Sequence, residues 1–122
     1  MRIMVVDDDA LAGELTAAVL ESAGHEVVLV ENGIEALEKF GEDRAFAMVV
    51  SDMNMPLVSG IELFRHLRDA NIDIPFILLT GDDPAPMMAE EPRLDVCLTK
   101  DASLEISLIE AIEAANERRR RA

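Results

Sequence analysis

The sequence predicts an α/β fold in which a parallel β-sheet is covered by helices on both faces. Five short apolar runs recur along the 122 residues, and their nearly unbroken apolar character is typical of strands buried on both faces. The segments between these runs carry apolar residues at helical spacing. This alternation of strand and helix favours right-handed crossover connections and a doubly wound sheet. The predicted strands are 3–6, 27–30, 47–50, 76–79 and 96–98.

Residue spacing predicts the intervening helices. The first helix is predicted from residues at helical spacing, namely Leu11, Leu15, Ala18, Val19 and Ser22. Gly24 then ends this helix, since glycine commonly follows a helix C-terminus. Shorter helices are predicted around 34–40 and 61–67, and the last helix around 104–115.

The segment between the fourth and fifth strands is irregular because it contains three prolines, Pro84, Pro86 and Pro92. Only 87–91 is free of proline, which leaves room for about one and a half helical turns. We therefore expect the fourth helix to be short or irregular. Within this segment, the pair Met87 and Met88 is a candidate for contact with a partner protein.

Composition indicates that residues 1–122 form a single globular domain. Half of the residues are apolar, and 25 acidic against 11 basic residues give a net charge of −14. No apolar stretch reaches the roughly 20 residues that a membrane-spanning helix needs, and Asp7 to Asp9 interrupt any signal peptide. The acidity argues against direct nucleic-acid binding. The lone cysteine, Cys97, excludes an internal disulfide, so a cytoplasmic location is expected.

Polar residues whose side chains can react or bind ligands follow four of the five predicted strands. Because the carboxyl ends of parallel strands meet at one edge of the sheet, we expect these residues to lie together. Any one of them could simply end a strand in water, but the joint pattern of acids, a hydroxyl and an amine favours a functional site. The segments are Asp7-Asp8-Asp9, Ser51-Asp52, Thr80-Gly81 and Thr99-Lys100.

This set of residue types points to a magnesium ion and a phosphoryl group. Carboxylates held close together repel one another unless a cation lies between them, and oxygen ligands suit a hard divalent ion such as Mg²⁺. A further carboxylate beside the ion could act as a nucleophile. A lysine ammonium and a threonine hydroxyl are suited to pairing with phosphoryl oxygens.

The same residues resemble the receiver domain of bacterial response regulators, and the resemblance extends over essentially the whole chain. The motifs that carry it are Val5-Val6-Asp7-Asp8, Ser51-Asp52-Met53-Asn54-Met55-Pro56 with Gly60, Leu79-Thr80-Gly81, and Lys100. Gly24-His25-Glu26-Val27-Val28 followed by Glu31-Asn32-Gly33 also resembles the second strand and helix of this family. The resemblance implies a flavodoxin-like sheet of five parallel strands in the order 2-1-3-4-5.

The resemblance also implies the roles of the site residues. Asp52 is expected to accept a phosphoryl group from a histidine kinase or a histidine phosphotransfer protein. Asp7, Asp8, Asp52 and the backbone carbonyl of Asn54 are the expected Mg²⁺ ligands. Thr80 is expected to bond the phosphoryl group and Lys100 to pair with it. Phosphorylation is then expected to change the 80–101 surface, which a downstream protein or an output domain reads.

Three features depart from the family pattern, and all lie on the expected output side. Asp101 follows Lys100 where the family usually has a proline with a cis peptide bond, so we expect a trans bond or a strained one here. Asp101 could cap the last helix or compete with Asp52 for Lys100. Cys97 stands where the family often has an aromatic residue that changes rotamer. The short fourth helix is the third departure, and it leaves formation of a homodimer open.

Two other functions compete with a phosphoacceptor. One is an interaction module that has the receiver fold but does not depend on phosphate. The other is a small Asp-dependent phosphatase, although the order of its motifs differs and 122 residues leave no room for a cap over the substrate. We favour the phosphoacceptor and expect no enzymatic activity beyond self-catalysed phosphoryl transfer to Asp52 and autodephosphorylation.

Overall fold

Five parallel strands form one sheet at the centre of the molecule. The computed structural model describes residues 1–121, with the side chains of residues 1–118. The strand order is β2-β1-β3-β4-β5, as the sequence predicts. All neighbouring pairs are parallel, and in the central pair Val5 of β1 lies opposite Val50 of β3. The strands are β1 Arg2–Val6, β2 Glu26–Val30, β3 Met48–Asp52, β4 Phe76–Thr80 and β5 Val96–Thr99.

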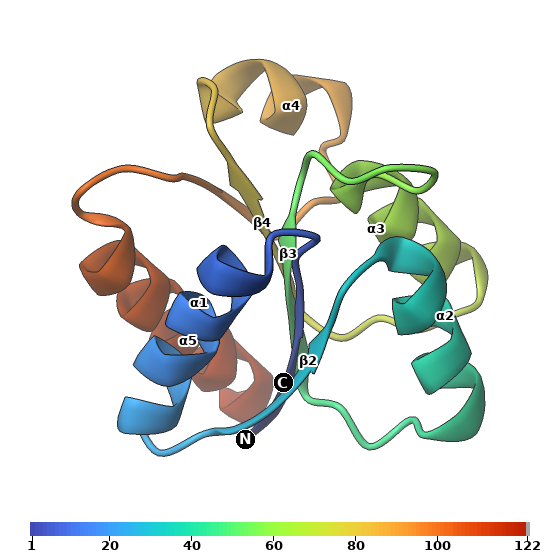
Figure 1. Ribbon diagram of the computed structural model, residues 1–122, viewed down its shortest axis with the longest axis horizontal. Coiled ribbons are helices and arrows are strands. Elements are labelled where there is room, and N and C mark those ends of the chain that lie inside the picture. Colours follow the sequence, from blue (N-terminus) through green and yellow to red (C-terminus); the bar gives the residue numbers. More distant parts are fainter. Residues whose placement is uncertain (122) are drawn as a thin grey trace.

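Helices cover both faces of this sheet. In Figure 1, α1 and α5 lie on one side, α2 and α3 lie on the other, and α4 lies at the top of the view, beyond the strand ends. The helices are α1 Ala10–Ser22, α2 Gly33–Glu42, α3 Gly60–Asp69, α4 Pro84–Glu90 and α5 Leu104–Arg121. Among the described residues, no helix is long and apolar enough to cross a membrane.

The sheet separates two apolar cores. Alternate residues of each strand point to opposite faces. Met4 and Val6 of β1 therefore enter a core that includes Phe64 of α3, and Ile3 and Val5 enter a core shared with α5. Because both faces are buried, the central strands are apolar nearly throughout, which explains the unbroken runs in the sequence.

The face of α1 that packs on the sheet is not the one formed by the large residues whose spacing predicts the helix. Leu11 and Leu15 are 67% and 61% exposed, whereas Gly13, Ala17 and Leu20 are buried. A Cβ atom at Gly13 would lie 2.9 Å from Leu29 Cδ1, so a larger residue there would displace the Leu29 side chain. The helix therefore packs on the sheet through Gly13, Ala17 and Leu20, and the two other leucines remain in solvent.

The fourth helix is short, as expected, but its position differs from the prediction. Instead of excluding the prolines, α4 begins at Pro84 and has Pro86 within its first turn. Proline is accepted there because the first N–H groups of a helix have no partner within the helix. The Asp83 side chain caps the helix by accepting a hydrogen bond from Ala85 N–H at 3.0 Å. Met87 and Met88, the candidate partner contacts, are half-buried against the α2 and α3 side of the core.

Candidate functional site

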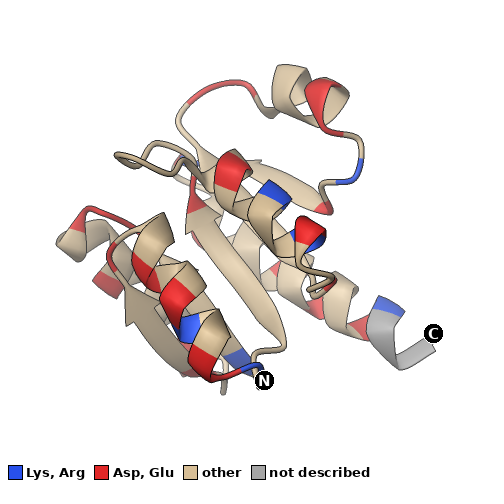
Figure 2. Cartoon of the chain, turned by 90° about the vertical axis from the view of Figure 1, so that its right-hand side faces the viewer, with Lys and Arg blue, Asp and Glu red and all other residues tan. Residues whose placement is uncertain are grey.

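The predicted site residues lie together at the carboxyl edge of the sheet. Asp7 directly follows β1 and Lys100 follows β5, whereas Asp52 and Thr80 are the last residues of β3 and β4. The sequence prediction ended both of those strands before these residues. Since β1, β3, β4 and β5 are consecutive in the sheet, their ends meet at its upper edge in Figure 1. Figure 2 shows acidic residues in the loops at this edge.

Asp7 is a buried carboxylate with only 3% of its surface exposed. Burial raises its pKa above the usual value, although the Asp9 N–H and Lys100 oppose this shift and nearby Asp52 adds to it. The Asp9 N–H donates to Asp7 Oδ1 at 2.9 Å. A charged carboxylate in this position is favoured by any cation that binds beside it.

Lys100 lies between two of the carboxylates. Its Nζ is 2.8 Å from Asp52 Oδ1 and 3.4 Å from Asp7 Oδ2. Burial lowers the pKa of Lys100, but the hydrogen bonds and charges of Asp52 and Asp7 outweigh it, and the net shift is upward. The ammonium therefore stays protonated and holds the Asp52 carboxylate in place.

Three carboxylates form a cluster that fits a divalent cation. Asp7, Asp8 and Asp52 each offer an oxygen, and these oxygens lie within 4.8 Å of one another. Asp8 is exposed, whereas Asp52 is 7% exposed, so the cluster is open to solvent on one side. Oxygen ligands and a site open to water suit Mg²⁺, which usually retains several waters.

The hydroxyl of Thr80 is available to donate a hydrogen bond. Thr80 is 5% exposed, and its Oγ1 accepts a hydrogen bond from the Asp82 N–H at 3.1 Å. A hydroxyl that accepts in this way still has its own hydrogen to donate. A cleft of about 300 Å³ opens beside it between the β3–α3 loop and α4, with Asn54, Thr80, Asp82 and Met87 among its lining residues.

The loop after Asp52 is tied closely to the strand that carries it. Gly60 N–H donates to Met53 O at 2.9 Å, and a Cβ atom at Gly60 would collide with the Asp52 carbonyl oxygen and with Leu78. Ser59 and Glu62 form a reciprocal capping box at the start of α3. The close approach of α3 to β3 therefore requires glycine at position 60.

The departures from the family pattern in and after β5 have simple structural outcomes. The peptide bond between Lys100 and Asp101 is trans, one of the two outcomes expected from the sequence. Asp101 Oδ1 accepts hydrogen bonds from Ser103 N–H and Oγ at 2.9 and 2.8 Å, in a turn that leads into α5. Lys100 makes its ion pairs with Asp7 and Asp52, not with Asp101. Cys97 is buried, and burial raises the pKa of its thiol.

Sequence reasoning missed the role of Asp9. Its side chain caps α1 by accepting from Leu11 and Ala12 N–H at 3.0 and 3.2 Å, while its own N–H fixes Asp7. A signal was present, since an aspartate directly before a helical pattern is typical of an N-cap. Asp9 therefore links the start of α1 to the orientation of the buried carboxylate.

Comparisons with known proteins agree with this geometry. The family model of the response regulator receiver domain matches residues 3–113. The response regulator MprA of Mycobacterium avium is 41% identical over 83 residues, which cover 68% of this chain and 36% of the relative. The matched part is thus about a third of that protein's length.

Solved structures are similar over nearly the whole chain. A response regulator receiver domain protein from Clostridium thermocellum superposes with a TM-score of 0.87 at 27% identity, covering 98% of this chain and 96% of the other. The response regulator TrrA from Thermotoga maritima, solved in complex with Mg²⁺-BeF, gives a TM-score of 0.83 at 32% identity, covering 93% and 97%. The chain belongs to the response regulator receiver domain family. Members of this family are generally signalling modules rather than enzymes.

Proposed function

We propose that residues 1–122 form one receiver domain that accepts a phosphoryl group on Asp52. The observation that carries the proposal is the position of this carboxylate: it is almost buried, it is held by Lys100 at 2.8 Å, and it lies within 4.8 Å of Asp7 and Asp8. A nucleophile, a cation site and fixed donors are what in-line phosphoryl transfer requires, and little covalent help from the protein is needed.

In this mechanism, an Asp52 carboxylate oxygen forms a bond to phosphorus while the P–N bond to the donor's imidazole breaks. The imidazole retains the bonding electron pair. Lys100 pairs with the new phosphoryl group, and the Thr80 hydroxyl donates a hydrogen bond to it. Asp7, Asp8, Asp52 and the carbonyl of Asn54 would hold Mg²⁺, which neutralises charge on the phosphoryl oxygens when bound. Attack of water on phosphorus later releases inorganic phosphate and restores Asp52.

The donor is proposed to be a histidine kinase or a histidine phosphotransfer protein. Two exposed leucines of α1, Leu11 and Leu15, support a protein donor because they lie on the helix that begins directly after Asp9. Apolar side chains that are this exposed next to a reaction site are suited to contact with another protein.

The response is proposed to involve the 80–101 surface, where a downstream protein or an output domain would read it. The Thr80 hydroxyl connects the site to this surface because it already accepts from the Asp82 N–H. In the proposed response, the Thr80 side chain rotates toward the phosphoryl group, which moves Oγ1 away from the Asp82 N–H and allows the loop before α4 to rearrange. A homodimer is one form the response could take, and the cytoplasmic location stays a prediction from composition.

The test is to incubate the protein with Mg²⁺ and a small acyl-phosphate donor and to measure its intact mass, beside Asp52→Asn. We expect one phosphoryl adduct that requires Mg²⁺, is released by hydroxylamine and is absent from the variant. Repeating the reaction with a phosphohistidine protein as donor excludes mere unsuitability of the small donor. No adduct from either donor on a folded protein would favour the phosphate-independent interaction module. Sustained hydrolysis of phosphomonoesters would favour the phosphatase.

A further inference from the structure

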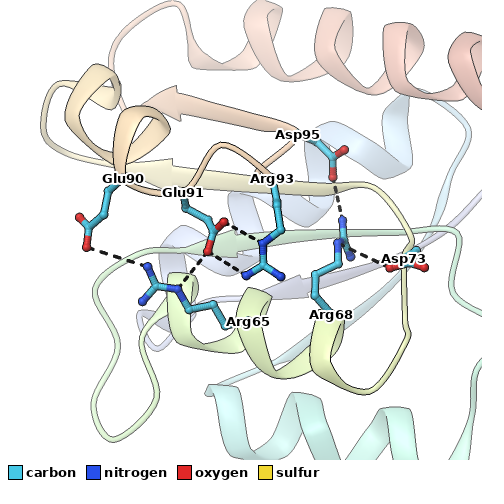
Figure 3. A network of polar contacts seen from close by, with 7 residues as sticks. All are labelled: Arg65, Arg68, Asp73, Glu90, Glu91, Arg93 and Asp95. Carbon is cyan, nitrogen blue, oxygen red and sulfur yellow. Dashed lines mark hydrogen bonds and ion pairs between the residues drawn. The ribbon is translucent and has the colours of Figure 1, made fainter.

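A group of ion pairs joins the end of α4 to α3, two helices that are well separated in the sequence (Figure 3). Glu91, the C-cap residue directly after α4, is 6% exposed although it is charged. Its Oε1 accepts from Arg65 Nε at 3.1 Å and from Arg93 Nη2 at 3.0 Å, and its Oε2 accepts from Arg93 Nε at 2.9 Å. We call Arg65, Glu91 and Arg93 the arginine clasp.

The arginine clasp is charged under all ordinary conditions. The hydrogen bond from Arg93 and that from Arg65 lower the pKa of Glu91 to about 2, despite the opposing effect of burial. Releasing either arginine would leave a buried carboxylate without its full set of donors, which is strongly unfavourable. We therefore expect the clasp to persist during any movement that releases less free energy than breaking the clasp would cost.

A second set of contacts fixes the chain just after the clasp. Arg68 of α3 donates to Asp95 Oδ2 at 3.0 Å, and the same oxygen accepts from the Phe76 N–H at 2.9 Å. The guanidinium groups of Arg68 and Arg93 lie 4.6 and 5.7 Å from the centre of the Phe64 ring. Residues 91–95 are thus bound to α3 and to the start of β4 through charged groups and an aromatic ring.

The preceding part of the same surface is held differently. In α4, which the structure describes in full, no residue is buried, and Asp82 and Asp83 before it are exposed. The start of this part is tied by the hydrogen bond from Asp82 N–H to Thr80, the hydroxyl that phosphorylation is proposed to redirect. Half-buried Met87 and Met88 pack against the core, and methionine packs adaptably. Glu90 adds a solvent-exposed ion pair with Arg65 at 3.9 Å. Residues 81–90 are therefore held by weaker contacts than 91–95 are.

We propose that the arginine clasp is a fixed pivot for α4, so that the response to phosphorylation is confined to residues 81–90 while 91–95 stay bound to α3. This inference rests on the proposed function and deepens it, because it divides the 80–101 surface into a moving part and a static part. A partner that senses phosphorylation would then have to contact 81–90. Glu91 is a positioning residue in this scheme, since it touches neither the phosphoryl group nor Mg²⁺.

The test compares backbone amide chemical shifts before and after addition of Mg²⁺ and beryllofluoride, a phosphoryl mimic. In the unmodified protein, we expect shifts at the backbone N–H groups of 82–90, where Pro84 and Pro86 have none, and no shifts at Arg93 to Asp95. In Glu91→Gln and in Arg65→Gln, we expect the shifts to extend to Leu94, whose N–H donates to Glu91 O at 3.1 Å. Arg65 has 40% of its side chain exposed, so its substitution is expected to leave the domain folded even if Glu91→Gln does not.

Glu90→Gln is the matched control. Glu90 neighbours Glu91 but is 66% exposed and lies 3.9 Å from Arg65, so the shift pattern should match that of the unmodified protein. Large shifts at 91–95 in the unmodified protein would overturn the pivot, as would clasp variants whose shifts stay confined to 81–90. Failure of the proposed function is distinguishable from both, because it would abolish the shifts at Asp52 and Thr80 and the phosphoryl adduct in the mass spectrum.

Discussion

At the scale of single residues, burial of Asp7 has a consequence for stability that depends on pH. Burial raises the pKa of this carboxyl in the folded chain above the reference value of 3.8. The folded state then binds the proton more tightly than the unfolded state does, so the contribution of Asp7 to stability falls as pH rises from the unfolded pKa through the folded pKa. Above that range the charged group remains a constant penalty as long as no cation is bound.

We therefore expect Asp7→Asn to be more stable than the unmodified protein at neutral pH in the presence of a chelator. The difference in free energy of unfolding between the two proteins should shrink as pH falls below the reference value of 3.8, because the carboxyl then becomes protonated in both states. Denaturant unfolding across this pH range measures it. Lys100 retains its 2.8 Å contact with Asp52 in the variant, so loss of the weaker Asp7 contact is not expected to reverse the sign. A variant less stable at neutral pH would contradict the role assigned to burial.

Gly60 is the residue whose side-chain size the site limits most directly. A Cβ atom there would collide with the Asp52 carbonyl oxygen and with Leu78. We expect Gly60→Ala to destabilise the fold by about 1–3 kcal/mol and to slow phosphorylation of Asp52, because α3 or the end of β3 must shift.

Gly41 provides the matched comparison for Gly60. It lies in α2, and a Cβ atom there has no neighbour within 4 Å among the described residues. Gly41→Ala should therefore raise stability by about 0.4–1 kcal/mol and leave phosphorylation unchanged. Unfolding midpoints and rates of adduct formation distinguish the two substitutions. Equal effects at both positions would mean that helix propensity, and not contact with β3, determines the effect of Gly60→Ala.

At the scale of elements, residue periodicity predicts that α1 is a helix but does not predict the face by which it packs on the sheet. The buried stripe is Gly13, Ala17 and Leu20, and the large Leu15 lies in solvent. We expect Leu20→Ala to destabilise the protein by about 2–5 kcal/mol and Leu15→Ala to change stability by less than about 0.5 kcal/mol. Thermal or denaturant unfolding of both variants measures these changes. A large loss of stability in Leu15→Ala would mean that α1 packs through the face predicted from the residue spacing.

The sequence predicts most elements because their signals are local. Apolar runs locate the five strands, and a polar residue at the end of a strand lies at a known edge, so the sequence alone groups Asp52, Thr80 and Lys100. The arginine clasp could not be found in this way. Arg65 and Glu91 are 26 residues apart, and nothing in their local sequence indicates that they meet. The position of α4 was predicted wrongly for a related reason. Proline excludes a helix only beyond its first turn, and the residue at which the helix begins is not evident from the prolines themselves.

At the scale of the whole molecule, excess negative charge influences every measurement. The net charge of −14 makes the folded chain repel itself, and any salt will weaken this repulsion. Figure 2 shows that acidic residues also occupy α2, away from the carboxyl edge of the sheet, so the repulsion is not confined to the site. A stabilising effect of Mg²⁺ must therefore be separated from a general effect of ionic strength.

Mg²⁺ is expected to stabilise the protein more than sodium at the same ionic strength, because it binds a cluster that exists only in the folded state. At a free concentration about 100 times the dissociation constant, the gain is about 2.7 kcal/mol. Asp8→Asn is the variant to compare, since Asp8 is exposed and its loss leaves the ion pair of Asp52 and Lys100 in place. Thermal unfolding should show the general salt effect in both proteins and the additional Mg²⁺ effect only in the unmodified one. If the variant gained as much from Mg²⁺, the ion would be acting on the charge of the whole molecule, and the three carboxylates at the sheet edge would not be its site.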